Sequence, residues 1–100
     1  MARVRLTEAA RDDLRDIRVY SKAAHGTTAT RAYLLGLRAT FTMLGDHPLA
    51  GAEAVELAAE LRSFAYRSHR IYYRPDVQGI VILRILHLAR DRQSALDPER

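Results

Sequence analysis

One stretch, residues 61–91, constrains the fold more than any other. Two apolar runs rich in β-branched and aromatic residues, Ile71-Tyr72-Tyr73 and Ile80-Val81-Ile82-Leu83, flank the break Pro75-Asp76-Val77-Gln78-Gly79. Strand-forming runs on either side of a Pro/Asp/Gly turn predict a β-hairpin. A further short run over residues 61–67 comes before it. The stretch therefore predicts a three-stranded antiparallel meander.

The predicted strands are rich in arginine. No carboxylate occurs between residues 61 and 75, whereas five arginines lie in or at the ends of the strands: Arg62, Arg67, Arg70, Arg74 and Arg84. Side chains alternate along a strand, so Arg70, Tyr72 and Arg74 share one face and His69, Ile71 and Tyr73 share the other. We interpret the cationic row as a candidate recognition surface. The alternative is that these arginines lie over apolar surface with their heads in water, or pair with the acidic helix upstream.

The residues before the meander predict one strand and two helices. The alternating run Arg3-Val4-Arg5-Leu6 is typical of a short strand, and Thr7 is a typical helix cap. Gly26 is placed to end this first helix in a left-handed conformation. Thr27 or Thr28 can cap a second helix that ends at residues 45–48. A connection of about three to five residues would make an antiparallel helical hairpin.

Each helix carries an apolar stripe at helical spacing. The second helix also contains Gly36, which costs about 1 kcal/mol relative to alanine; close helix packing is a reason to keep it. Residues 47–60 are predicted to be a loop with a helical turn or an irregular connection, and residues 90–96 a short terminal helix. The element order is β-α-α-β-β-β. We expect one α+β domain over residues 1–100, with a helical hairpin packed on a small, mainly antiparallel sheet.

Composition narrows the class of protein. The chain has 100 residues, of which 48% are apolar, and its formal net charge is +4. That apolar fraction suffices for one core, and the charge permits contact with nucleic acid or with an acidic protein. The chain has no cysteine, which fits a reducing cytosol. We see neither a signal peptide nor a membrane-spanning run, and we expect a cytoplasmic protein.

The motifs of common catalytic sites are missing from the sequence. The glycines are too scattered for a phosphate-binding loop, and no two histidines have metal-ligand spacing. Acidity at a helix start explains Asp12, Asp13 and Asp16 better than a metal cluster does. His87 is a conceivable general acid or base, although a histidine that holds the strand end by a hydrogen bond is the simpler reading. We therefore predict no catalytic residue, metal or cofactor.

The ordered set of motifs resembles the ParE toxins of the RelE/ParE superfamily over nearly the whole chain. The matches in the meander are Leu61-Arg62, Tyr66, Ser68-His69, Ile71, Tyr73-Arg74, Ile82 to His87 and Arg90-Asp91. Upstream, the N-terminal strand, Thr7-Glu8-Ala9-Ala10, the aspartates that lead to Leu14, Ile17-Arg18-Val19-Tyr20 and His47-Pro48-Leu49-Ala50-Gly51 look similar too.

The resemblance implies a bacterial type II toxin of the kind linked to plasmid stabilisation, with a helical hairpin packed on a sheet. A ParD-like antitoxin neutralises such toxins by laying a C-terminal segment across them. ParE members are described as inhibitors of DNA gyrase, whereas the RelE branch cuts mRNA on the ribosome. A third alternative is a degenerate member that only binds its antitoxin.

The residues needed for RNA cleavage distinguish the RelE branch from the ParE branch. Cleavage of RNA needs a base, an acid and cations that stabilise the phosphorane. Arg70 and Arg90 can supply the cations, but no tyrosine or histidine follows His87, where the RelE pattern usually has one. Tyr73 and His87 match the ParE pattern instead. We favour a gyrase-binding inhibitor over a ribosome-dependent mRNA endonuclease.

Under this prediction, contact with nucleic acid is expected only through the target complex. Two sets of contact residues follow, one for the target and one for the antitoxin. The candidate contacts to the target are Arg62, Arg67, Arg70, Arg74, Arg84, His87 and Arg90. An amphipathic antitoxin helix is expected in an apolar groove beside the helical hairpin, with contacts to Leu14, Ile17, Leu34, Leu37 and Phe41.

Overall fold

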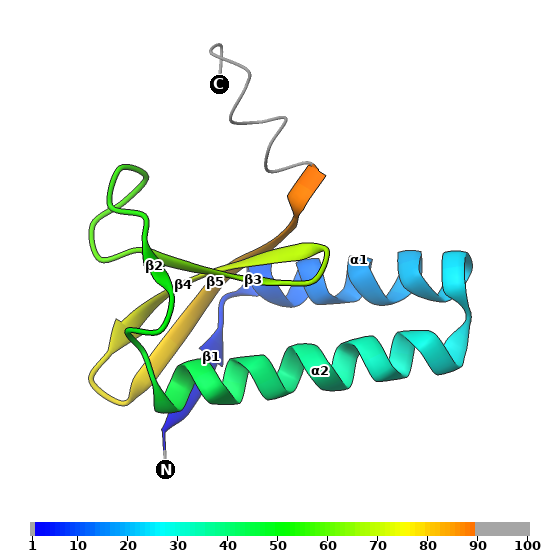
Figure 1. The fold of residues 1–100 in the computed structure, drawn as a ribbon, viewed down its shortest axis with the longest axis horizontal. Helices are drawn as coiled ribbons and strands as arrows, with labels where there is room; N and C mark the ends of the chain where they lie inside the picture. The colour runs from blue at the N-terminus through cyan, green and yellow to red at the C-terminus, as the bar shows by residue number, and fades with distance from the viewer. Residues whose placement is uncertain (1, 90–100) are drawn as a thin grey trace.

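Two long helices lie on the same side of a five-stranded sheet in the computed structural model, which describes residues 2–89 (Figure 1). The elements are β1 (Arg3–Leu6), α1 (Glu8–His25), α2 (Thr27–Asp46), β2 (Ala52–Glu53), β3 (Arg62–Tyr66), β4 (His69–Asp76) and β5 (Gly79–His87). The predicted α+β architecture is confirmed. The connection over residues 47–60 contains the short strand β2, which the sequence did not predict, and the predicted terminal helix at residues 90–96 lies outside the described residues.

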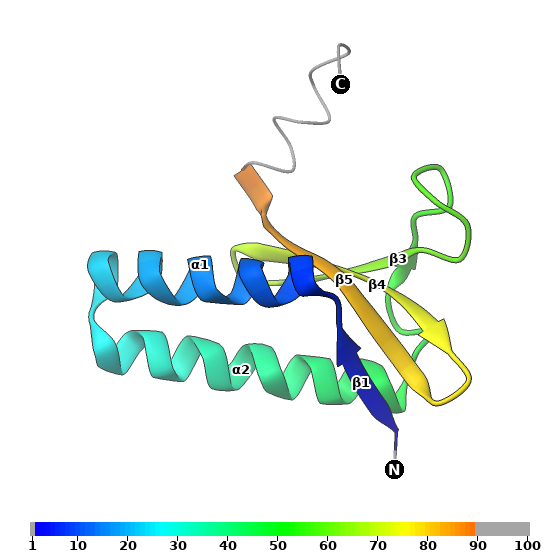
Figure 2. The same ribbon diagram turned by 180° about the vertical axis from the view of Figure 1, so that it is seen from behind.

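The sheet has the strand order β1-β5-β4-β3-β2. Strands β3, β4 and β5 form the predicted antiparallel meander, and β2 pairs antiparallel with β3. β1 pairs parallel with β5, from Arg3 opposite Gly79 to Leu6 opposite Ile82. Figure 2, seen from behind, shows β1 running beside β5 and leading directly into α1. β5 is therefore flanked by β1 along its first half only.

The start of α1 was predicted correctly and the start of α2 was not. The Thr7 hydroxyl accepts a hydrogen bond from the Ala10 amide at 3.1 Å and so caps α1. Gly26 ends α1 at a φ of 90°, as predicted, but it is also the cap of α2. One residue therefore joins the helices, because a glycine with positive φ can reverse the chain at once. The hydroxyl of Thr30 closes the corner by donating to the Gly26 carbonyl at 2.8 Å.

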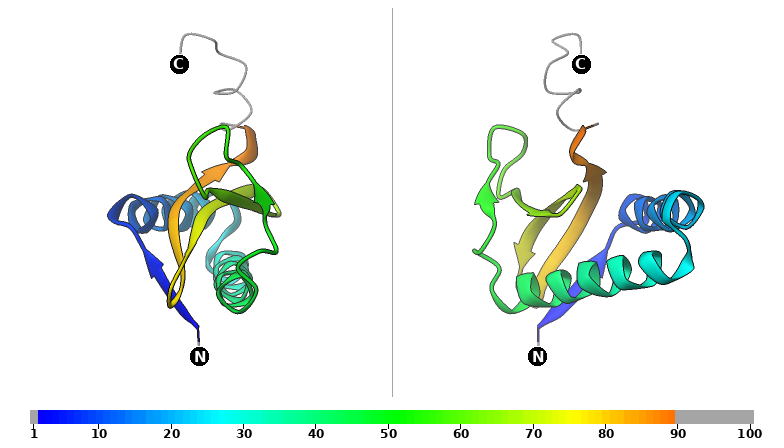
Figure 3. Two further views of the ribbon diagram at one scale, coloured as in Figure 1. Left: turned by 90° about the vertical axis from the view of Figure 1, so that its left-hand side faces the viewer. Right: turned by 45° about the vertical axis from the view of Figure 1, so that its right-hand side comes forward.

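The core lies between the helices and one face of the sheet. Ile71, Tyr73 and Ile82 on the sheet and Leu37 on α2 are fully buried. The hydroxyl of Tyr73 donates to the Pro48 carbonyl at 2.8 Å and accepts from the Gly51 amide at 2.8 Å. These bonds tie the loop that follows α2 to β4, the central strand of the sheet. Figure 3 shows the course of this loop from the end of α2 to β2.

Close packing does explain the glycine within α2. A Cβ atom built on Gly36 would overlap the hydroxyl of Tyr66, which belongs to β3. A glycine within a helix lowers stability by about 1 kcal/mol relative to alanine. At this position it leaves room for the Tyr66 ring to pack against α2. The neighbour is a strand residue rather than the other helix.

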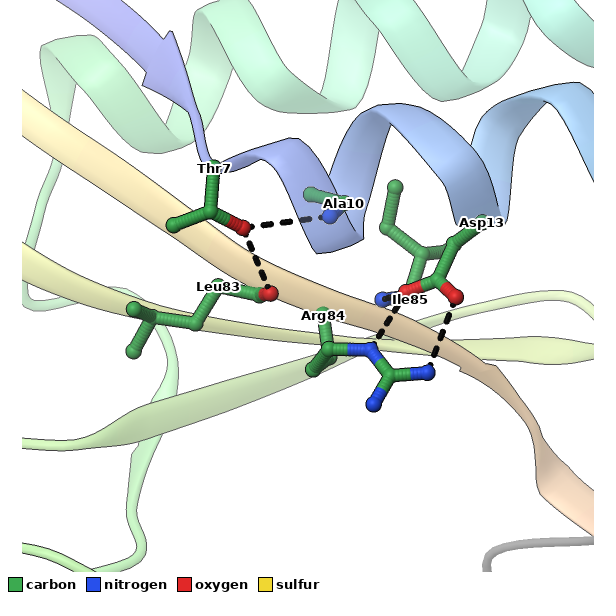
Figure 4. Close-up of polar contacts among 6 residues, drawn as sticks. All are labelled: Thr7, Ala10, Asp13, Leu83, Arg84 and Ile85. Carbon is green, nitrogen blue, oxygen red and sulfur yellow. Dashed lines mark hydrogen bonds and ion pairs between the residues drawn. The ribbon is translucent and has the colours of Figure 1, made fainter.

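The second half of β5 is held by side chains of α1 instead of by a strand. β1 ends at Leu6, and the Thr7 hydroxyl then donates to the Leu83 carbonyl at 2.9 Å. Asp13 accepts from the Ile85 amide at 2.9 Å and binds the Arg84 guanidinium with two hydrogen bonds of 2.8 and 2.9 Å (Figure 4). These bonds raise the pKa of Arg84 above its ordinary value. The carboxylate of Asp13 therefore accepts a backbone hydrogen bond from β5 at a position that β1 does not reach.

Asp13 should therefore matter far more for stability than its neighbour in sequence. Replacing Asp13 by alanine leaves the buried Ile85 amide without an acceptor, and we expect Asp13→Ala to lower the free energy of unfolding by about 2 kcal/mol. Asp12 is exposed and, among the described residues, pairs only with Arg15, so Asp12→Ala should change the free energy of unfolding by less than about 0.5 kcal/mol. Urea unfolding followed by circular dichroism measures both, and equal losses would contradict the role of Asp13.

Candidate functional site

The sheet has one face turned away from the helices, and it carries the predicted cationic row. Ile71 and Tyr73 of β4 are fully buried, whereas Arg74 is exposed. The predicted alternation along β4 is thereby confirmed. The register places Arg74 opposite Val81 of β5, and Val81 opposite Arg5 of β1, so Arg5 lies on the same face. We call Arg5, Arg70, Tyr72 and Arg74 the cationic face.

Hydrogen bonds shape the edges of the cationic face. The guanidinium of Arg70 donates to the Ser63 hydroxyl at 3.2 Å, and Arg5 pairs with Asp76 at 2.9 Å. The amide of Gln78, and after it the Arg5 side chain, lower the pKa of Asp76 by hydrogen bonding to the carboxylate. In the part of the chain that the structure describes, Arg74 has no ion pair. Its charge is available to a partner.

The other predicted target contacts are scattered. Arg62 donates to the Gly51 carbonyl at 2.7 Å and holds the loop after α2. Arg67 is exposed in the turn after β3, with its guanidinium 5.6 Å from the centre of the Tyr66 ring. Arg84 pairs with Asp13, which is the alternative that the sequence had left open for these arginines. His87 is exposed at the end of β5, and Arg90 lies outside the described residues.

Most of the residues predicted to contact the antitoxin are buried. Ile17, Leu37 and Phe41 belong to the core and present almost no surface to a partner. Leu14 and Leu34 are only partly buried. Leu34 lines a groove of about 250 Å³ between the two helices, which we call the helical groove, together with Arg18, Lys22, Thr27, Thr30, Arg31, Leu35 and Arg38.

A cluster of aromatic rings joins α2 to the end of the sheet. The hydroxyl of Tyr33 lies 2.6 Å from Nδ1 of His69. The ring of His69 packs edge-on against Tyr33 and against His87, whose centre is 5.2 Å away, and Tyr33 packs in the same manner against Tyr66. Sequence reasoning missed this aromatic cluster, since Tyr33 and His69 are 36 residues apart and nothing local connects them.

Burial controls the charge of this cluster. Loss of hydration, and secondly the neighbouring His87, lower the pKa of His69 to about 4. Burial also raises the pKa of Tyr33. Both side chains are therefore neutral near pH 7, and the cluster serves to pack the end of the sheet against α2.

Neither a metal site nor a membrane segment is found in residues 2–89. No group of three or more histidine, cysteine, aspartate or glutamate side chains there could hold a metal ion. Neither of the two helices in that range is apolar over a length that would cross a bilayer.

Comparisons with known proteins agree with one another. A sequence model described as the ParE toxin of the type II toxin-antitoxin system, parDE, matches residues 4–92. Toxin ParE1 of Caulobacter vibrioides is 35% identical over 92 residues, which cover 92% of this chain and 95% of that protein. A solved structure described as a chromosomal ParDE TA system from P. aeruginosa has a TM-score of 0.74 at 19% identity, over 87% of this chain and 96% of that chain. That structure is similar in fold.

The buried state of His69 predicts a loss of stability in acid. The pKa of about 4 in the folded chain lies below the value of about 6.5 expected when the chain is unfolded. The neutral imidazole therefore stabilises the fold above pH 6.5, and this contribution should disappear as the pH falls from about 6.5 to 4. Unfolding measured across this range should show a smaller decline for His69→Asn than for the wild type. An NMR titration that placed the His69 pKa above 6 would contradict the argument.

Proposed function

Because this chain belongs to the ParE toxin family of type II toxin–antitoxin systems, we propose that it arrests growth by binding DNA gyrase in the cytoplasm and that a ParD-like antitoxin neutralises it. On a plasmid, such a pair would stabilise inheritance. The observation that supports a binding mechanism is the cationic face. It is not covered by either helix, and it presents arginines on a rigid sheet.

The cationic face suits a large, negatively charged partner. Guanidinium groups on a strand have fixed spacing, and each can bind a carboxylate or a phosphate with two hydrogen bonds. The net charge of +4 would also speed the encounter with an acidic surface or with gyrase-bound DNA. The proposed mechanism therefore needs geometry and charge on the toxin and no proton transfer.

A RelE-type endonuclease remains the second candidate, since His87 is exposed at the sheet end beside His69. A nuclease must bring a general acid and a general base to the scissile phosphate. Tyr73, the other titratable candidate, is fully buried, and its hydroxyl is bonded to Pro48 and Gly51. It cannot reach a substrate, which supports the binding mechanism over the nuclease.

Reversing the charge of the cationic face should abolish toxicity. We expect Arg70→Glu/Arg74→Glu to weaken inhibition of gyrase supercoiling by at least about tenfold, as the loss of 1.4 kcal/mol of binding free energy would. The matched control, Arg11→Glu/Arg15→Glu, makes the same change in net charge on α1 and should keep its activity. Purified wild-type protein should leave mRNA on translating ribosomes intact.

Three outcomes would contradict this proposal. Equal inhibition by the folded cationic-face variant and the wild type would remove the cationic face from the mechanism. Equal losses in both variants would show that only net charge matters. Cleavage of message with unaffected gyrase would establish the endonuclease instead.

The helical groove is the proposed site for an amphipathic antitoxin helix. Its floor includes Leu34 and Leu35, and Leu35 is 63% exposed. Four cations flank this apolar floor: Arg18, Lys22, Arg31 and Arg38. None of them has an ion pair within the described residues. An acidic helix with one apolar stripe would complement both features.

A polar group on the groove floor should weaken the antitoxin. We expect Leu35→Asp to raise the dissociation constant of the toxin–antitoxin complex by at least about tenfold, because it places a carboxylate against the apolar stripe of the helix. Leu49 is equally exposed, at 70%, but lies in the loop after α2, so Leu49→Asp is the control. Calorimetry with a cognate ParD-like antitoxin measures both, and equal affinities would place the antitoxin helix elsewhere.

A further inference from the structure

A second cleft opens between α1 and the far end of β5. Its volume is about 600 Å³. It exists because β1 covers β5 only as far as Ile82, after which the chain turns into α1. The side chains that line this edge cleft are Asp13, Asp16, Ile17, Tyr20, Ser21, His25, Tyr33, Ser68, His69, Ile85, His87 and Ala89.

The edge of β5 inside the cleft has an unused backbone donor. Asp13 accepts from the Ile85 amide on this outer side. The Leu88 amide donates to Ser68 at 2.8 Å, on the side of β4. Amides alternate in direction along a strand, so the His87 amide points outward like that of Ile85. Within residues 2–89, the His87 amide donates no hydrogen bond outside the pairing of the strands. Asp13 already occupies the Ile85 donor, so the His87 amide is the outward donor that an added extended segment can pair with.

The charge of the cleft is opposite to that of the helical groove. Among the described residues that line the cleft there is no lysine or arginine, whereas there are two aspartates. Arg84 neutralises Asp13, but Asp16 is exposed and has no ion pair in the described part of the chain. The ring of Tyr20, 69% exposed, lies in the same lining. A carboxylate beside an exposed aromatic ring is a setting in which an arginine or lysine binds well.

We propose that the edge cleft receives an extended segment of the antitoxin, which adds a strand to β5 at His87 and places an arginine or lysine against Asp16. This proposal rests on the proposed function, because it names a second contact of the same antitoxin. A helix in this position would satisfy its own backbone and leave the His87 amide unpaired, whereas a strand uses it. The occupant is therefore extended, and it carries positive charge.

The backbone contact can be tested at His87. His87→Pro removes the outward amide, while His87→Ala removes the same imidazole and keeps the amide. Proline is tolerated at an edge position of this kind, and the extended Leu86 before it suits a following proline. With a purified cognate ParD-like antitoxin, we expect His87→Pro to raise the dissociation constant at least about tenfold relative to His87→Ala. In the wild type, exchange of the His87 amide should slow on complex formation.

The charge contact has its own matched pair. Asp16→Arg should raise the dissociation constant at least about tenfold, because it repels the cationic side chain. Asp12→Arg makes the same change one turn earlier on α1, at a residue outside the cleft lining, and should bind as the wild type does. Asp16→Arg should inhibit gyrase normally, since Asp16 is not on the cationic face.

The possible results separate the two proposals. Equal affinities of His87→Pro and His87→Ala, or of Asp16→Arg and Asp12→Arg, would overturn the edge cleft as an antitoxin site. If the wild type still binds antitoxin and inhibits gyrase in that case, the proposed function stands. A wild-type chain that does not bind the antitoxin overturns both the edge cleft and the antitoxin part of the proposed function.

Discussion

The attachment of α1 to the outer edge of β5 determines how the rest of the molecule is arranged. Asp13 replaces the missing strand beside Ile85 and also holds Arg84. A carboxylate can do this because it accepts several hydrogen bonds at once and binds a guanidinium through both oxygens. The bond fixes α1 against the sheet, and the single-residue turn at Gly26 then directs α2 to the same side. As a consequence, neither helix covers the opposite face of the sheet.

This arrangement separates surfaces of different charge. The cationic face lies on the side of the sheet away from the helices, the helical groove has four cations around a leucine floor, and the edge cleft holds the exposed carboxylate of Asp16. Charges of opposite sign in one small domain would attract each other if they were adjacent, and then they would be lost to partners. Here the helical groove and the edge cleft are lined by different residues of α1, Arg18 and Lys22 in the groove and Asp16 in the cleft. A basic chain can therefore present both an acid-binding and a base-binding surface.

Local sequence signals predicted the local structure. The Pro75 to Gly79 turn, the Thr7 cap and the Gly26 helix end each depend on residues close in the chain, and all three were read correctly. Contacts between distant residues were not. Asp13 was interpreted as helix-start acidity, because the sequence does not show which of three aspartates faces the sheet. The same limit explains the groove residues, since Ile17, Leu37 and Phe41 have the spacing of an apolar stripe whether the sheet or a partner covers it.

Strand addition at β5 would explain how an antitoxin neutralises a toxin whose target site is on another surface. Side chains of an added strand alternate, so every second one would enter the edge cleft and the others would stand on the open face of the sheet. There they would lie next to Leu86, which pairs with Arg70 of the cationic face. The antitoxin would thus extend the sheet and cover the cationic face from the side. A helix held in the helical groove by the same chain would raise the effective concentration of that strand, so two modest contacts could give one tight complex.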